Sequence, residues 1–171
     1  HYTYGRGYYE EYKADQALPE YDFDPIQLTD TTISQSDLVR QLWLDNHFYG
    51  GVFSTQYNQS DRWSLTVGGG YNEYDGDHFG EVVWAEFAGS TDVQNKYYQN
   101  NAFKTDFNTY IKVKYDIATS LSTFVDAQVR HITYEFLGKD RQQAPGGGQE
   151  VVDVQQSDRL TFLNPKAGLT Y

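Results

Sequence analysis

Large apolar or aromatic side chains fall on every second position of the segment WSLTVGGGYNEYDGDH, which begins at Trp63 and ends at His78. From Trp63 to Tyr71 the odd positions carry this apolar series, apart from Gly69, and the even positions carry small or polar residues. A period of two predicts a β-strand with one apolar and one polar face. The segment continues into acidic and aromatic residues without a break, so the predicted strand exceeds the usual length.

The same alternation predicts six strands, the first of them partial. They cover residues 1–4, 37–57, 62–78, 104–116, 121–137 and about 159–171. In the fourth strand, Ile111 and Val113 share one side, whereas Lys112 lies on the other. Charged residues in the middle of a strand, on one face only, are typical of a wall between lipid and a hydrated interior.

The predicted connections alternate in length. Hairpin-length turns lie near residues 58–61 and 116–120, and long loops lie near residues 6–36, 79–103 and 138–157. A half-buried sheet of a β-sandwich shows the same alternation of faces. Short turns at one end and long loops at the other are typical of transmembrane β-barrels. We therefore expect an all-β fold, an antiparallel up-and-down meander of about six strands that forms a section of a large transmembrane β-barrel.

Composition narrows the classes of partner and chemistry. The 171 residues carry a net charge of −11, which argues against nucleic acid as a partner because phosphate binding requires a basic surface. Cysteine is absent, which excludes disulfides and thiolate metal sites within the chain. The sequence contains no run of about 18 apolar residues, so it predicts no membrane-spanning helix.

Enzyme chemistry finds little support in the sequence. The four histidines lie in different predicted segments, and neither an HExxH motif nor a GxSxG nucleophile elbow occurs. We therefore expect no catalytic residues and no enzymatic activity.

Several segments carry a resemblance to a known family. The phrases WLDNHFYG, YDGDHFGE and NPKAGLTY are the most telling, and the similarity covers essentially the whole chain. The chain resembles the β-barrel domain of TonB-dependent outer-membrane receptors, of the type found in Bacteroidetes. The family's barrel has roughly 22 strands around a plugged lumen. The resemblance thus implies that this chain is an internal fragment of the barrel, residues 1–171, without the plug domain.

This resemblance implies a location, a function and partners. The cell outer membrane supplies the lipid, and energy comes from TonB, which acts through the missing plug region. The cargo implied is a scarce small-molecule nutrient such as a siderophore, heme or cobalamin. A second hypothesis is a secreted or surface β-sandwich that binds carbohydrate. The two differ in whether the apolar strand faces meet lipid or each other.

The predicted outer loops supply the candidate binding residues. Aromatic rings with polar edges suit the recognition of an amphipathic ligand. The candidates are Tyr8, Tyr9, Tyr12, Trp84, Phe87, Tyr97 and Tyr98. The carboxylates of Asp75, Asp77 and Glu81 offer oxygen ligands for calcium, although they match no complete calcium-binding loop. No other cofactor is expected.

Overall fold

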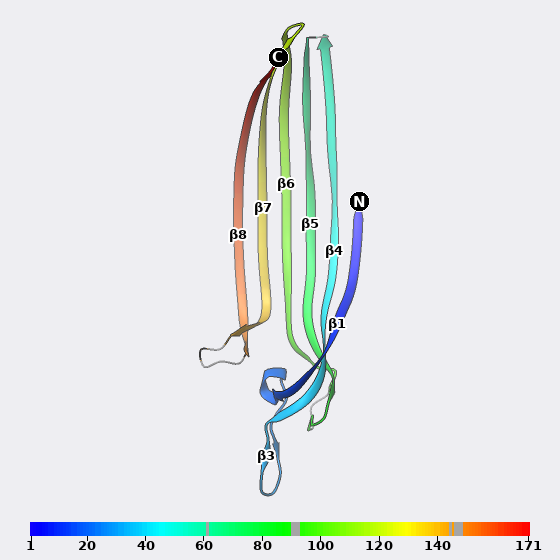
Figure 1. Ribbon diagram of the computed structural model, residues 1–171, viewed down its shortest axis with the longest axis vertical. Coiled ribbons are helices and arrows are strands. Elements are labelled where there is room, and N and C mark those ends of the chain that lie inside the picture. Colours follow the sequence, from blue (N-terminus) through cyan, green and yellow to red (C-terminus); the bar gives the residue numbers. More distant parts are fainter. Residues whose placement is uncertain (61, 90–92, 144, 146–148) are drawn as a thin grey trace.

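A computed structural model describes residues 1–60, 62–89, 93–143, 145 and 149–171. Six strands form one antiparallel sheet in the order β1-β4-β5-β6-β7-β8, as Figure 1 shows. Their bounds are β1 Tyr2–Ala17, β4 Gln35–Ser60, β5 Trp63–Ala85, β6 Lys96–Ala118, β7 Leu121–Gln143 and β8 Gln149–Thr170. The chain between β1 and β4 contains the 3-10 helix η1 (Leu18–Tyr21) and a small hairpin of β2 (Ile26–Gln27) and β3 (Thr32–Ile33).

The predicted all-β, up-and-down antiparallel meander is confirmed. Neighbours in the main sheet are consecutive along the chain apart from the β2–β3 hairpin, and the sheet is open, with β1 and β8 at its edges. Two tight turns lie at one end, and the three longer connections lie at the other, here called the loop end (Figure 1). None of the helices in the described parts of the chain is long and apolar enough to cross a membrane.

The strands are longer than the sequence predicted, so the loop bounds were wrong. The connections at the loop end cover residues 18–34, 86–95 and 144–148, not 6–36, 79–103 and 138–157. Antiparallel pairing needs only backbone groups, and it continues through polar segments such as β7–β8, where Lys139 lies opposite Asp153. Residues 61, 90–92, 144 and 146–148 of the predicted turns and loops lie outside the described residues.

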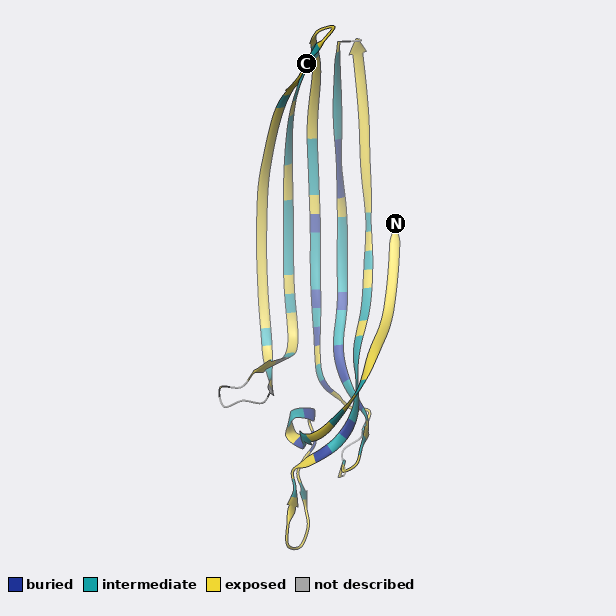
Figure 2. Ribbon diagram, in the orientation of Figure 1, coloured by how far each residue is buried: buried dark blue, intermediate teal, exposed yellow. Residues whose placement is uncertain are grey.

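One side of the sheet is apolar over the half nearer the tight turns, and we call it the apolar face. Two rows of register partners cross it, Tyr57-Leu65-Val113-Val125-Ala167 and Thr55-Val67-Ile111-Ala127-Pro165. No second layer covers these side chains within the described structure, since Val125 is 59% and Ile111 48% exposed (Figure 2). The two-layer core that a β-sandwich requires is therefore not formed by the described residues.

Aromatic pairs mark both limits of this apolar stretch on β5 and β6. Trp63 lies opposite Tyr115 at one limit, and Tyr71 lies opposite Phe107 at the other. The stretch from Trp63 to Tyr71 is nine residues long by its numbering. Tilted strands that cross a bilayer need roughly 9–11 residues, so the stretch has the length of a membrane-spanning segment.

The opposite side, the polar face, carries charge near the middle of the sheet. Asp106 is only 4% exposed, and its carboxylate accepts hydrogen bonds from Arg130 Nε at 3.0 and 3.1 Å. Arg130 also donates through Nη2. Gly68 also faces the polar side, where a Cβ would lie 2.5 Å from the Tyr110 hydroxyl oxygen. The tyrosine ring thus lies across the glycine, which leaves no room for a larger residue.

The compact hydrophobic core of the described structure lies at the loop end of the polar face. Its buried members are Leu18, Tyr21, Phe23, Leu38, Val82 and Tyr97. They come from η1 and the chain just after it and from β4, β5 and β6, so the connection between β1 and β4 is folded against the sheet. The first predicted loop is therefore a packed element over much of its length.

Candidate ligand-binding site

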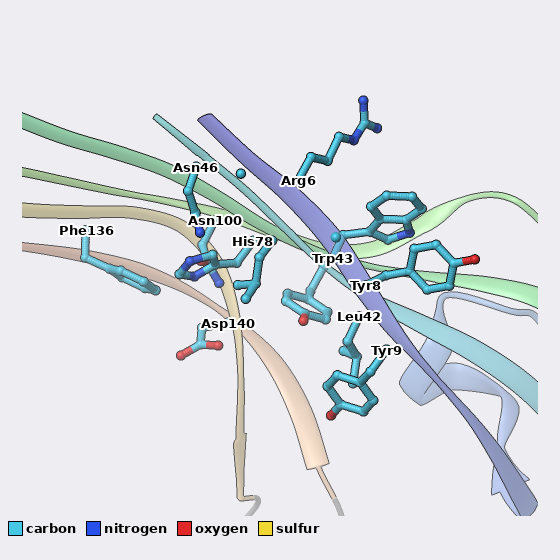
Figure 3. Close-up of a pocket in the computed structure, with 14 residues that line it drawn as sticks. Arg6, Tyr8, Tyr9, Leu42, Trp43, Asn46, His78, Asn100, Phe136 and Asp140 are labelled. Atoms are coloured by element: carbon cyan, nitrogen blue, oxygen red, sulfur yellow. The ribbon is translucent and has the colours of Figure 1, made fainter. Parts of the chain in front are cut away.

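A pocket of about 810 Å³ lies next to this core, toward the middle of the sheet (Figure 3). It is lined by Gly5, Arg6, Gly7, Tyr8, Tyr9, Leu42, Trp43, Leu44, Asn46, His78, Tyr98, Asn100, Phe136 and Asp140. Most of these residues belong to rows of the polar face, such as the row that joins Gly7, Leu44, His78 and Asn100. The volume lies in the range of sites for small-molecule ligands.

Glycines of β1 and β5 shape the pocket. A Cβ at Gly5 or Gly7 would meet nothing within 4 Å, so these positions of β1 leave open space. A Cβ at Gly80 would lie 2.4 Å from the ring of Tyr98, so that ring lies across β5 and forms a flat surface. The pocket therefore has an open side along β1 and an aromatic surface near the core.

Polar side chains also lie at the pocket. The Tyr74 hydroxyl donates to Asn46 Oδ1 at 2.9 Å and lies 3.5 Å from His78 Nε2. Asn100 is 4% exposed, and its Nδ2 donates to the Lys139 carbonyl oxygen at 3.2 Å. The Asn100 Oδ1 atom has no hydrogen-bond partner among the described residues. A buried acceptor without a partner is costly, and a ligand donor would satisfy it.

The guanidinium of Arg40 holds the connection beside the pocket in place. It donates to Glu11 Oε2 through Nη2 at 2.7 Å and to the Tyr21 hydroxyl through Nη1 at 3.2 Å. Hydrogen bonds from Lys13 and then from Arg40 lower the pKa of Glu11 below its usual value. Strand β1, strand β4 and helix η1 are thereby joined by one polar network.

A row of aromatic rings lies on the reverse side of the sheet at the same height. Tyr8 packs on Trp43 with ring centroids 4.4 Å apart, and Trp43 stacks on Phe79 at 5.8 Å. Arg6 lies over the Trp43 ring at 5.0 Å, and its Nε is 3.4 Å from Asp45 Oδ2. Figure 3 shows the Arg6 side chain pointing away from His78 and Asn100.

The predicted binding aromatics separate into three groups. Tyr8, Tyr9 and Tyr98 line the pocket. Tyr97 is buried in the core and its ring packs against Tyr21 at 4.8 Å. The remaining three lie away from the pocket lining: Tyr12 donates to Asp37, Trp84 lies one residue before the end of β5 and is 48% exposed, and the Phe87 amide donates to Ser36 Oγ.

The predicted calcium ligands are only partly brought together. Asn101 Nδ2 donates to Asp75 Oδ1 at 2.7 Å and to Asp77 Oδ1 at 3.0 Å, so these two carboxylates are adjacent. Glu81 lies four residues along the same strand, roughly 13 Å from Asp77 at the usual strand rise. Among the described residues no group of three His, Asp or Glu side chains is placed to hold a metal.

Sequence reasoning missed most of the pocket. His78 and Phe136 lie in predicted strands and Asn100 lies in a predicted loop, and none of the three is a predicted binding residue. The alternation could have placed His78 and Leu44 on one face, because their spacing matches the register of β4 and β5. The buried state of Asn100 depends on neighbouring strands and has no local signal.

Comparison with known proteins gives no match to this chain, whether with protein-family models, curated proteins or solved structures.

Proposed function

We propose that this chain is a section of the wall of an outer-membrane β-barrel receptor that imports a nutrient with energy from TonB. One observation carries the proposal: a single-layer sheet leaves an apolar stretch of membrane-spanning length uncovered on one face. The other face carries the Asp106–Arg130 ion pair, which suits a hydrated or plugged interior. The resemblance in WLDNHFYG, YDGDHFGE and NPKAGLTY supplies the family.

In this proposal the pocket lies inside the barrel near its outer mouth. The long strands support it: β4 has 26 residues and a length of roughly 85 Å, far more than the bilayer core of about 30 Å. The part of the sheet between the apolar stretch and the loop end therefore projects beyond the membrane. A ligand arriving from outside meets the loops and then the pocket, and this wall contributes binding residues without catalysis.

The proposal is tested on the natural protein that contains this chain, expressed in a Gram-negative host. We expect it in the outer-membrane fraction, folded in lipid vesicles, with ligand uptake that stops when TonB is deleted while ligand binding persists. Recovery as a water-soluble monomer without detergent would contradict the membrane assignment. Uptake that continues unchanged without TonB would contradict the active-transport assignment.

A further inference from the structure

The side chains that line the pocket on the polar face favour some classes of ligand over others. Its strongest feature is Asn100, whose side chain is almost completely buried. Because Nδ2 already donates to the Lys139 carbonyl oxygen, the orientation of the amide is fixed, and Oδ1 is left as an acceptor. No described residue donates to Oδ1, so this oxygen can accept a hydrogen bond from an N–H or O–H group of a ligand.

The charged residues of the pocket also bear on the class of ligand. Arg6 is the one arginine or lysine, and Asp140 the one acidic residue, among the residues that line the pocket. The Arg6 guanidinium is directed to the opposite side of the sheet, toward Asp45 and Trp43 (Figure 3). Asp140, an acidic residue, also lines the pocket, and the whole chain carries a net charge of −11. Both features disfavour a polyanion.

The remaining lining suits a ligand with a flat or aliphatic surface. The Tyr98 ring lies across Gly80, and Leu42, Leu44 and Phe136 add apolar surface around it. Asn46 and His78 add polar groups within the same hollow. Pockets for small molecules are usually lined by apolar side chains, and a small number of polar groups among them orient the ligand.

We propose that this pocket binds a neutral ligand rich in amide or hydroxyl groups, donating a hydrogen bond to Asn100 Oδ1, and that it discriminates against polyanionic ligands. This inference rests on the proposed receptor function and names the chemical class of its cargo.

The test uses the natural protein containing this chain in detergent, with three probes. Two are neutral, cyanocobalamin and a cyclic ferric trihydroxamate peptide, and one is a trianionic ferric tris-catecholate of similar size to the peptide chelate. We expect at least one neutral probe to bind at least tenfold more tightly than the catecholate. Tighter binding of the catecholate than of both neutral probes, or no binding of either neutral probe, overturns the proposal.

Two substitutions assign the selectivity to this pocket. Asn100→Leu removes the acceptor, and we expect roughly five- to tenfold weaker binding of the neutral probe, the usual effect of one lost hydrogen bond. Asn108→Leu is the matched control, because Asn108 lies on the same strand and face but outside the pocket lining. Equal effects of the two substitutions would overturn the role of Asn100.

A second variant keeps the test valid if Asn100→Leu fails to fold. Asp140→Asn preserves shape and removes the negative charge, and we expect it to tighten catecholate binding severalfold while neutral-probe binding changes little. An unchanged ratio of the two affinities would contradict the charge selection. These outcomes concern the cargo only, since membrane insertion and TonB dependence are measured separately and would stand if the ligand class proved wrong.

Discussion

At the scale of single residues, Arg40 joins three segments at the loop end of the sheet. Its guanidinium contacts Glu11 on β1 and Tyr21 on η1, and its side chain is 11% exposed. Because Tyr21 belongs to the β1–β4 connection, this hydrogen bond joins the connection to β4. We infer that Arg40 determines how firmly this connection closes the loop end of the pocket.

Replacing Arg40 with Met should therefore loosen the connection. Loss of the bonds to Glu11 and Tyr21 should lower the local opening free energy of residues 18–34 by about 1–3 kcal/mol. Hydrogen exchange of these amides measures the effect. Arg6→Met is the control, because the Arg6 side chain is 51% exposed and its contact with Asp45 is long. Equal protection of residues 18–34 in the two variants would contradict the role of Arg40.

Acid should loosen the same connection. The pKa of Glu11 is lowered from its ordinary value of 4.5 by hydrogen bonds from Lys13 and Arg40. The stabilisation from a carboxylate of lowered pKa is complete above the ordinary value and is lost as the pH falls through the lowered one. Protection of residues 18–34, corrected for intrinsic exchange, should thus fall below about pH 4.5.

Glu11→Gln should remove part of this pH dependence. A remainder should persist, since the pKa of Asp37 is also lowered, by a hydrogen bond from Tyr12 and then by the Asp15 amide. The same slope in Glu11→Gln and the parent protein would show that Glu11 plays no part.

Residue-level burial could be predicted only in part. Tyr97 and Tyr98 are neighbours of the same type, yet one is in the core and the other lines the pocket. The register shifts between Gly80 and Glu81 of β5, where Gly80 lies opposite Tyr98 and Glu81 lies opposite Lys96. Such a bulge depends on how two distant segments pair, so the sequence around residues 97 and 98 does not reveal it.

At the scale of elements, the strands and their faces followed from the period-two alternation, whereas their ends did not. The apolar signal ends near Tyr71 on β5, but pairing with β4 continues to Ala85. Polar strand ends are held by backbone ladders and cross-strand pairs, which leave little trace in hydrophobicity. Loop bounds based on the hydrophobic pattern were accordingly too wide.

Two adjacent glycines of β4 test the packing of these strands. A Cβ at Gly50 would lie 2.4 Å from the Tyr71 backbone oxygen, whereas a Cβ at Gly51 would meet nothing within 4 Å. Gly50→Ala should thus destabilise the β4–β5 pairing by about 1–3 kcal/mol, and Gly51→Ala should be neutral or slightly stabilising. Urea unfolding of the vesicle-folded natural protein measures both. Similar midpoints for the two variants would contradict this close approach of β4 and β5.

At the scale of the whole molecule, the single-layer sheet has two chemically different faces. Apolar rows cross β4 to β8 on one face, and the other face carries the Asp106–Arg130 pair. An open sheet of this kind leaves backbone groups at both edges and invites pairing with further strands. Closure into a barrel would satisfy both edges and place the apolar face outward.

The most direct test of this account is the accessibility of successive positions along β6 in a lipid bilayer. The chain contains no cysteine, so single cysteines at positions 108–113 can each carry a spin label in the vesicle-folded natural protein. We predict high oxygen accessibility at 109, 111 and 113, and high accessibility to a water-soluble nickel chelate or protein-restricted mobility at 108, 110 and 112. Equal lipid exposure at even and odd positions, or oxygen maxima at the even ones, would contradict the account.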